Sequence, residues 1–125
     1  MKNVKFYRCQ ICGNVIGLID GDPSRISCCG KTMEQMNPNS VDAAAEKHVP
    51  VCKREGEKLI VSVGDVAHPM EEDHYIMWIA QVTDNQTTRI RLNPGDIPQV
   101  EFTYVGSATV YAYCNKHGLW KTEVE

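Results

Sequence analysis

The chain has 125 residues, which is near the commonest size for one domain and also leaves room for a small metal-bound module beside a larger core. Its formal net charge of −3, without a basic stripe, excludes a typical nucleic-acid-binding protein. No apolar run approaches the roughly 18 residues that cross a bilayer, and residues 1–6 lack a signal-peptide core, so we expect a cytoplasmic protein that has no membrane partner.

The N-terminal segment, residues 1–36, is rich in cysteine and poor in large aliphatic side chains, so it needs a cross-link or a metal ion to fold. It holds four of the six cysteines, namely Cys9, Cys12, Cys28 and Cys29. In the cytosol such cysteines are more often metal ligands than disulfides. Two residues separate the first pair, and Gly13 permits the tight turn that follows it. The adjacent second pair reaches the same ion only through a local turn. Four thiolates fit iron or zinc, and a structural zinc ribbon is the alternative.

A linker-like composition at residues 36–40 places a boundary there, between domains 1–36 and 37–125. Residues 40–46 predict a short surface helix with Ser40 as its N-cap. The charge is uneven, because residues 1–36 carry five cations and three anions, whereas the rest carries eight cations and thirteen anions. An anionic substrate therefore needs local positive charge at its site in the second domain.

From Lys58 onward the sequence predicts strands, because short segments rich in β-branched and aromatic residues alternate with turn residues. The six expected strands are Lys58–Val63, Tyr75–Thr83, Thr87–Leu92, Gln99–Val105, Thr109–Cys114 and Leu119–Val124. No segment between them is long enough to be the helix of a parallel crossover. We therefore predict an all-β protein, in which the small metal module precedes an immunoglobulin-like antiparallel β-sandwich.

All four histidines lie in the second domain, and with one cysteine they form a candidate metal-ligand set: His48, His68, His74, Cys114 and His117. A turn after the strand that ends at Cys114 returns His117 toward the sulfur. His68 and His74 flank a loop ahead of a strand, where a rigid scaffold positions ligands, and His48 comes from a loop that Pro50 ends. Four imidazoles and one thiolate leave one position of an iron ion open, which favours reactive iron over structural zinc. A thiolate opposite that position donates electron density to whatever binds there.

The motifs around these residues resemble those of a known family. The cysteine pattern of residues 9–29 is similar to that of desulforedoxin, which implies one iron on four cysteines. The segments 46–50, 68–75 and 114–117 resemble the superoxide reductases, and the whole chain resembles desulfoferrodoxin, the two-iron form of that family. The resemblance implies an equatorial plane of four imidazoles with Cys114 as the axial ligand. It also implies that Glu46 occupies the sixth position in the oxidised state and that Lys47, on the same mobile loop, attracts the anion.

The function that this resemblance implies is the one-electron reduction of superoxide to hydrogen peroxide at ferrous iron, which detoxifies superoxide. An external donor supplies the electron, and the family implies a small iron protein such as rubredoxin, together with a homodimer. Three alternatives stay open: a dismutase, which needs no donor; a structural module with zinc in both sites; and a copper electron-transfer protein. The last is disfavoured because four histidines are present and no methionine follows His117. Cys52 lies outside both sets and is expected to be a buried small hydrophobic residue.

Overall fold

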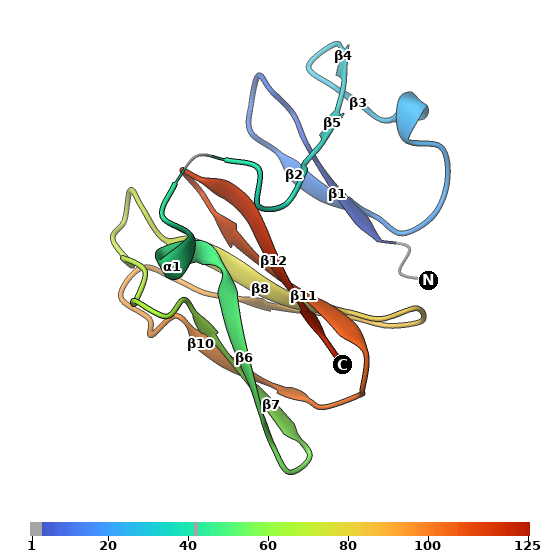
Figure 1. The fold of residues 1–125 in the computed structure, drawn as a ribbon. Coiled ribbons are helices and arrows are strands. Elements are labelled where there is room, and N and C mark those ends of the chain that lie inside the picture. The colour runs from blue at the N-terminus through green and yellow to red at the C-terminus, as the bar shows by residue number, and fades with distance from the viewer. Residues whose placement is uncertain (1–3, 42) are drawn as a thin grey trace.

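The computed structural model describes residues 4–41 and 43–125, which form a small N-terminal module and a larger β-sandwich (Figure 1). The module has a three-stranded antiparallel sheet of order β2-β1-β5 and a separate hairpin of β3 and β4. Its elements are β1 (Lys5–Arg8), β2 (Val15–Leu18), the 3-10 helix η1 (Pro23–Arg25), β3 (Ser27–Cys28), β4 (Lys31–Thr32) and β5 (Glu34–Gln35). Its own buried core consists of Tyr7, Cys9 and Met33. So small a core needs further cross-linking to be stable.

The larger unit is a sandwich of two antiparallel sheets, with strand orders β10-β7-β6 and β12-β11-β8-β9. The strands are β6 (Pro50–Glu55), β7 (Lys58–Val63), β8 (Ile76–Val82), β9 (Thr87–Arg91), β10 (Gln99–Thr103), β11 (Ala108–Cys114) and β12 (Gly118–Val124). Alternate residues of β7 are buried, as the two-residue period of a strand with one face in the core requires. The predicted fold class, an all-β protein with a small module ahead of an antiparallel sandwich, is confirmed.

Strand β11 is buried along its whole length because both of its faces are covered. One face, with Val110 and Ala112, points into the sandwich core. The other face presents Tyr111 and Tyr113, which pack in a second cluster with Phe6 of the N-terminal module. The module therefore covers the outer face of the β12-β11-β8-β9 sheet, and strand β11 lies in the middle of the molecule.

All six predicted strands are present, with ends that differ from the expectation by at most two residues. Strand β6 was missed, because its charged residues Lys53, Arg54 and Glu55 are exposed and weaken the alternating pattern. It lies at the edge of its sheet and begins at Pro50, which a strand edge tolerates.

The helix expected over residues 40–46 lies later in the chain, as the single turn α1 (Ala45–His48). Ser40 does not cap it, since the Ser40 hydroxyl donates to the carbonyl of Asn37 over 2.6 Å, and the N-cap is Ala44 without a side-chain bond. Glu46, expected at the end of that helix, and Lys47, which the resemblance placed on a mobile loop, thus both lie within one helical turn. No helix within the described residues is long and apolar enough to cross a membrane.

Candidate metal centres

The first candidate centre begins directly after β1, where the chain turns around the sulfur of Cys9. The amide of Gly13 donates to the carbonyl of Cys9 over 3.0 Å, and the amide of Cys12 donates to the Cys9 sulfur over 3.4 Å. Gly13 has φ +80°, a left-handed conformation that favours glycine. This turn brings the first two thiols to the same side of the chain.

The adjacent cysteines Cys28 and Cys29 lie at the tip of the β3–β4 hairpin. In an extended chain their side chains would point to opposite faces, and the turn removes this obstacle. Cys29 and Gly30 form the two-residue turn, with φ of 53° and 77°, as a type I′ hairpin requires. The sulfur of Cys28 lies 3.5 Å from that of Cys12 and 3.9 Å from that of Cys29. All four sulfurs of the set fall within 4.8 Å of one another.

The thiols of this centre have unequal proton affinities. Amide donors from Cys12 and Ile11 lower the pKa of Cys9 to about 6, whereas the contact with the Cys12 thiol raises the pKa of Cys29 to about 12 and also raises that of Cys28. A cluster in which one thiolate forms readily while its neighbours keep their protons is suited to a cation that replaces those protons. The donor set fits iron or zinc.

The second candidate centre lies at the end of the sandwich next to α1. Its five residues come from four places: His48 ends α1, His68 and His74 lie in the connection from β7 to β8, Cys114 ends β11, and His117 lies in the turn before β12. Two backbone hydrogen bonds between Glu71 and His74 close a tight turn that presents the His74 ring. The structure thus brings together every ligand that the sequence predicted for this centre.

The four imidazoles form a closed ring in which each stands nearly at right angles to the next. The centroids of consecutive rings, in the order His48, His68, His74, His117 and back to His48, are 4.6, 4.8, 5.0 and 4.9 Å apart. The corresponding angles between ring planes are 73°, 84°, 74° and 86°. Such a ring aims one nitrogen of each imidazole at a common centre.

Backbone carbonyls select the nitrogens that face this centre. Nδ1 of His48 lies 2.7 Å from the carbonyl of Ala44, and Nδ1 of His68 lies 2.7 Å from that of Pro69. Each Nδ1 therefore carries the proton and donates it, which leaves the Nε2 lone pair free. His117 presents its Nδ1 instead, 3.1 Å from Nε2 of His48.

These distances fit a shared cation. The Nε2 atoms of His48 and His68 are 3.0 Å apart although both are free of protons. Two nitrogens bound at about 2.1 Å to one ion and at right angles stand about 3.0 Å apart. The Nε2 atom of His74 is buried and has no hydrogen-bond partner in the described part of the chain. An unpaired buried nitrogen is costly unless something binds it, so the residues present fit a metal ion.

Burial favours the neutral form of three of the imidazoles. It lowers the pKa of His68 to about 4 and is also the main cause that lowers the pKa of His48 and His74. Neutral imidazole is the form that binds metals, so these rings are available as ligands at neutral pH.

Cys114 stands next to this ring of imidazoles, with its sulfur 3.9 Å from Nδ1 of His117. Burial raises the pKa of the Cys114 thiol, and the amide groups of Lys116 and His117 oppose that rise. A bound cation is thus needed to hold it as a thiolate. Cys52 lies in neither centre, half-buried on β6, and burial raises its pKa to about 11.

Two supporting residues were not predicted from the sequence. The indole of Trp120 stacks on the ring of His48 and donates to the carbonyl of His117. Asn115 accepts a hydrogen bond from the amide of Tyr75 over 2.9 Å and donates to the carbonyl of Asp73 over 3.0 Å. The sequence offers one sign of their role: Asn115 lies within the Cys114–His117 segment, and Trp120 follows it by three residues.

Comparison with known proteins decides the family. The profile described as "Desulfoferrodoxin" matches residues 40–123, and the profile described as "Desulfoferrodoxin, N-terminal domain" matches residues 2–36. The chain belongs to the desulfoferrodoxin family. It is 45% identical over 123 residues to the desulfoferrodoxin of Syntrophotalea carbinolica, with 98% of each chain covered. The four cysteines and the five-ligand set match the two iron sites of desulfoferrodoxin.

Similarity extends to proteins named for an activity. The chain is 36% identical over 106 residues to a protein of Pyrococcus abyssi named superoxide reductase, with 69% of this chain and 92% of that protein covered. The crystal structure of the superoxide reductase from Treponema pallidum superposes with a TM-score of 0.77 at 30% identity and covers 96% of this chain and 98% of that one. Similarity to the Treponema structure thus spans both the module and the sandwich of this desulfoferrodoxin family member.

Proposed function

We propose that the protein is a superoxide reductase, an oxidoreductase that converts superoxide to hydrogen peroxide at the centre formed by the four histidines and Cys114. The observation that carries the proposal is the closed ring of imidazoles with the sulfur beside it, in a chain whose relatives include superoxide reductases. An iron ion held there supplies one electron, which together with two protons turns superoxide into hydrogen peroxide.

The chain's own residues prepare this centre for an anion. The carbonyls of Ala44 and Pro69 hold the Nδ1 protons of two imidazoles, so the rings keep their orientation while the charge at the centre changes. Burial of Cys114 limits access to its sulfur and favours electron donation from the thiolate into the centre.

Lys47 is proposed to attract superoxide. Its side chain is exposed on α1, next in sequence to the buried ring of His48. Its positive charge lies close enough to lower the pKa of His48, after burial and the charge of His117. In a domain whose anions outnumber its cations, an ammonium at this position raises the local concentration of an anionic substrate.

Glu46 is proposed to occupy the remaining coordination position in the oxidised protein. Its side chain is exposed on the same helical turn, and its charge acts on the His48 ring in the opposite sense to that of Lys47. A carboxylate suits the more highly charged ion, and a small movement of α1 is enough to release it. The backbone carbonyl of Glu46 accepts from the amide of Val66 over 2.9 Å, which ties the turn to the segment that follows β7.

The remaining expectations from the sequence are part of the same proposal. We propose that residues 1–36 and 37–125 are two domains, that the donor is a small iron protein such as rubredoxin, and that the protein works as a cytoplasmic homodimer. Six free cysteines support a reducing compartment. The small core of the N-terminal module supports pairing of two copies.

Stopped-flow mixing of the ferrous protein with superoxide tests the function. The expected result is one hydrogen peroxide per oxidised centre without oxygen release. Stoichiometric oxygen release would establish a dismutase instead. Metal analysis of the protein as purified is the second test, because two zinc ions per chain would support a purely structural protein.

A further inference from the structure

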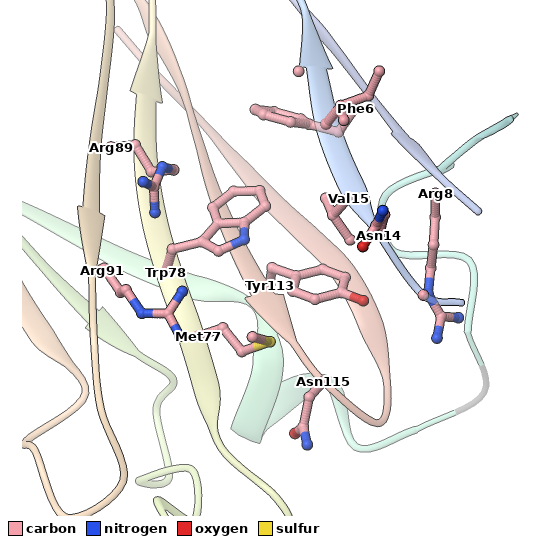
Figure 2. A pocket seen from close by; sticks show the side chains of 13 residues that line it. Phe6, Arg8, Asn14, Val15, Met77, Trp78, Arg89, Arg91, Tyr113 and Asn115 are labelled. Atoms are coloured by element: carbon pink, nitrogen blue, oxygen red, sulfur yellow. The ribbon is translucent and has the colours of Figure 1, made fainter. Parts of the chain in front are cut away.

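A cavity of about 500 Å³ lies between the N-terminal module and the outer face of the β12-β11-β8-β9 sheet (Figure 2). Its module side is formed by β1, β2 and the turn between them, and its sheet side by β8, β9 and the end of β11. A volume in this range is typical of binding pockets. Neither candidate metal centre opens into it through a ligand side chain, since no histidine or cysteine is among its lining residues.

Three arginines line this cavity, and we refer to it as the arginine groove: Arg8, Arg89 and Arg91. No aspartate or glutamate lines it. Within residues 4–41 and 43–125, none of the three guanidinium groups has an ion-pair or hydrogen-bond partner, and the Nε atom of Arg8 is buried and unsatisfied. The buried Nε of Arg8 is costly without an acceptor, and the exposed guanidinium groups of Arg89 and Arg91 add two more charged donors to the same cavity, so an anionic partner is favoured.

The arrangement of Arg89 and Arg91 suits a partner larger than a single ion. Both lie on β9, two residues apart and so on one face, and β9 is the exposed edge of its sheet. Their side chains extend over the sheet toward Trp78, while Arg8 stands across the groove on the module (Figure 2). The positive charge therefore spans both units, on a chain whose larger part carries eight cations against thirteen anions.

The groove also adjoins both candidate metal centres along the chain. Arg8 on its module side is bonded directly to Cys9 of the first centre, and Tyr113 on its sheet side is bonded directly to Cys114 of the second. The rings of Trp78 and Tyr113 stack with their centroids 5.5 Å apart and their planes inclined by 15°, and both rings line the groove.

We propose that the arginine groove is the docking surface for an acidic, one-electron carrier protein that supplies this enzyme with electrons. The inference rests on the proposed function, which requires an external donor. In each cycle the reduced carrier loses one electron and this protein gains one, which replaces the electron that superoxide takes. Carboxylates of the carrier would pair with the three guanidinium groups, and such complementarity mainly accelerates association.

The test compares two double variants of the iron-loaded protein that lose the same charge. R89Q/R91Q removes two cations from the groove, whereas K53Q/R54Q removes two from exposed positions of β6, in the opposite sheet. Titration with a reduced rubredoxin chosen for its net negative charge is followed by NMR on the 15N-labelled protein. The proposal expects shifts at the Nε–H groups of the groove arginines and a Kd that rises roughly tenfold or more in R89Q/R91Q but not in K53Q/R54Q.

Kinetics separate this proposal from the function on which it rests. Reduction of the ferric protein by rubredoxin should slow by roughly tenfold in R89Q/R91Q at low ionic strength, and the difference should shrink as salt is added. Reduction by the hexaammineruthenium(II) cation and oxidation of the ferrous protein by superoxide should keep their wild-type rates. If wild type itself fails to reduce superoxide, the proposed function falls, whatever rubredoxin does.

Other outcomes overturn the docking proposal while leaving the function intact. Equal rubredoxin kinetics in both double variants would do so. So would a change of oligomeric state in R89Q/R91Q, measured by analytical ultracentrifugation, because the groove would then be an interface between copies of this chain. Binding of inorganic phosphate at the three arginines that rubredoxin fails to displace would assign the groove to a small anion. R8Q gives an independent check from the module side, with the same expected loss.

Discussion

The indole of Trp120 lies against the imidazole of His48, with ring centroids 4.9 Å apart and planes inclined by 24°. The same indole donates its Nε1–H to the carbonyl of His117 over 3.0 Å. One buried side chain thus contacts two ligands of the candidate active centre, His48 and His117, which lie far apart in the sequence. It fixes the plane of one ring and the backbone position of the other.

Replacing Trp120 should therefore change both stability and the centre. In W120F the stacking surface remains but the hydrogen bond to His117 is lost, so we expect a loss of about 1 kcal/mol in the free energy of unfolding. W120A should cost about 3–5 kcal/mol, because it also leaves a cavity. Urea unfolding measures both values, and the visible absorption band of the iron-loaded protein should shift in each variant.

The second tryptophan of the chain provides the control. Trp78 is equally buried but stacks on Tyr113, away from the histidine rings. W78F should lower the stability and leave the absorption band in place. If W78F and W120F altered the band alike, the particular role of Trp120 in holding the ligands would be wrong.

Asn115 links two ligand-bearing segments, since it bonds to the backbone at both Asp73 and Tyr75, on either side of His74. N115A leaves the Tyr75 amide without its acceptor, at a cost of about 1–3 kcal/mol, and should release iron to a chelator faster than wild type. N115D keeps the acceptor and loses only the donor, so its release rate should lie between the two. Identical release from N115A and wild type would contradict this role.

Much of the fold was predictable because its strands follow simple rules. Strand β7 alternates buried and open residues, and its ends were predicted as observed. Strand β6 was missed because an edge strand buries little and therefore carries little pattern. The helical turn α1 was misplaced because four residues hold too little propensity to define a helix without the surrounding structure.

The ligand sets were easier to predict than the residues that orient them. Histidine and cysteine are rare and chemically distinctive, so their motifs are visible in one sequence. Trp120 and Asn115 act through packing and backbone bonds that exist only after the strands have paired. The preference of His117 for Nδ1 is likewise set by the turn from β11 to β12, which spacing alone does not specify.

Lys47 should control the encounter with superoxide. We expect K47A to lower the second-order rate constant of the ferrous protein by up to about tenfold at low ionic strength and to weaken its salt dependence. Pulse radiolysis over a series of salt concentrations measures both. K53A removes an exposed charge from β6 and should change neither quantity. An unchanged rate in K47A at low salt would exclude steering by this residue.

Gly64 makes room for the helical turn α1. A Cβ atom at this position would stand 2.7 Å from the carbonyl oxygen of Glu46, a backbone atom that cannot move without moving the turn. G64A should therefore displace Glu46 and Lys47 and slow the reaction with superoxide, and it should lower the melting temperature. In G17A the new Cβ atom would meet the ring of Phe6 at 3.3 Å, far from α1 in the chain, so the superoxide rate should not change. Equal rates in G64A and wild type would show that the turn adapts.

The buried imidazoles make the metal-free protein sensitive to acid. Burial lowers the pKa of His68 from 6.5 to about 4. Between these two pH values the unfolded chain therefore binds a proton at His68 that the folded chain does not. This destabilisation is absent above about pH 6.5, and stability falls as the pH drops toward 4, by up to about 1.4 kcal/mol per pH unit for one proton. Urea unfolding of the metal-free protein at a series of pH values should show a steeper slope in wild type than in H68Q, which has no proton to gain at this position. The iron-loaded protein should keep its stability to lower pH, because the ion competes with the protons for the imidazoles. The same slope in metal-free wild type and H68Q would mean that His68 is hydrated once the metal is removed.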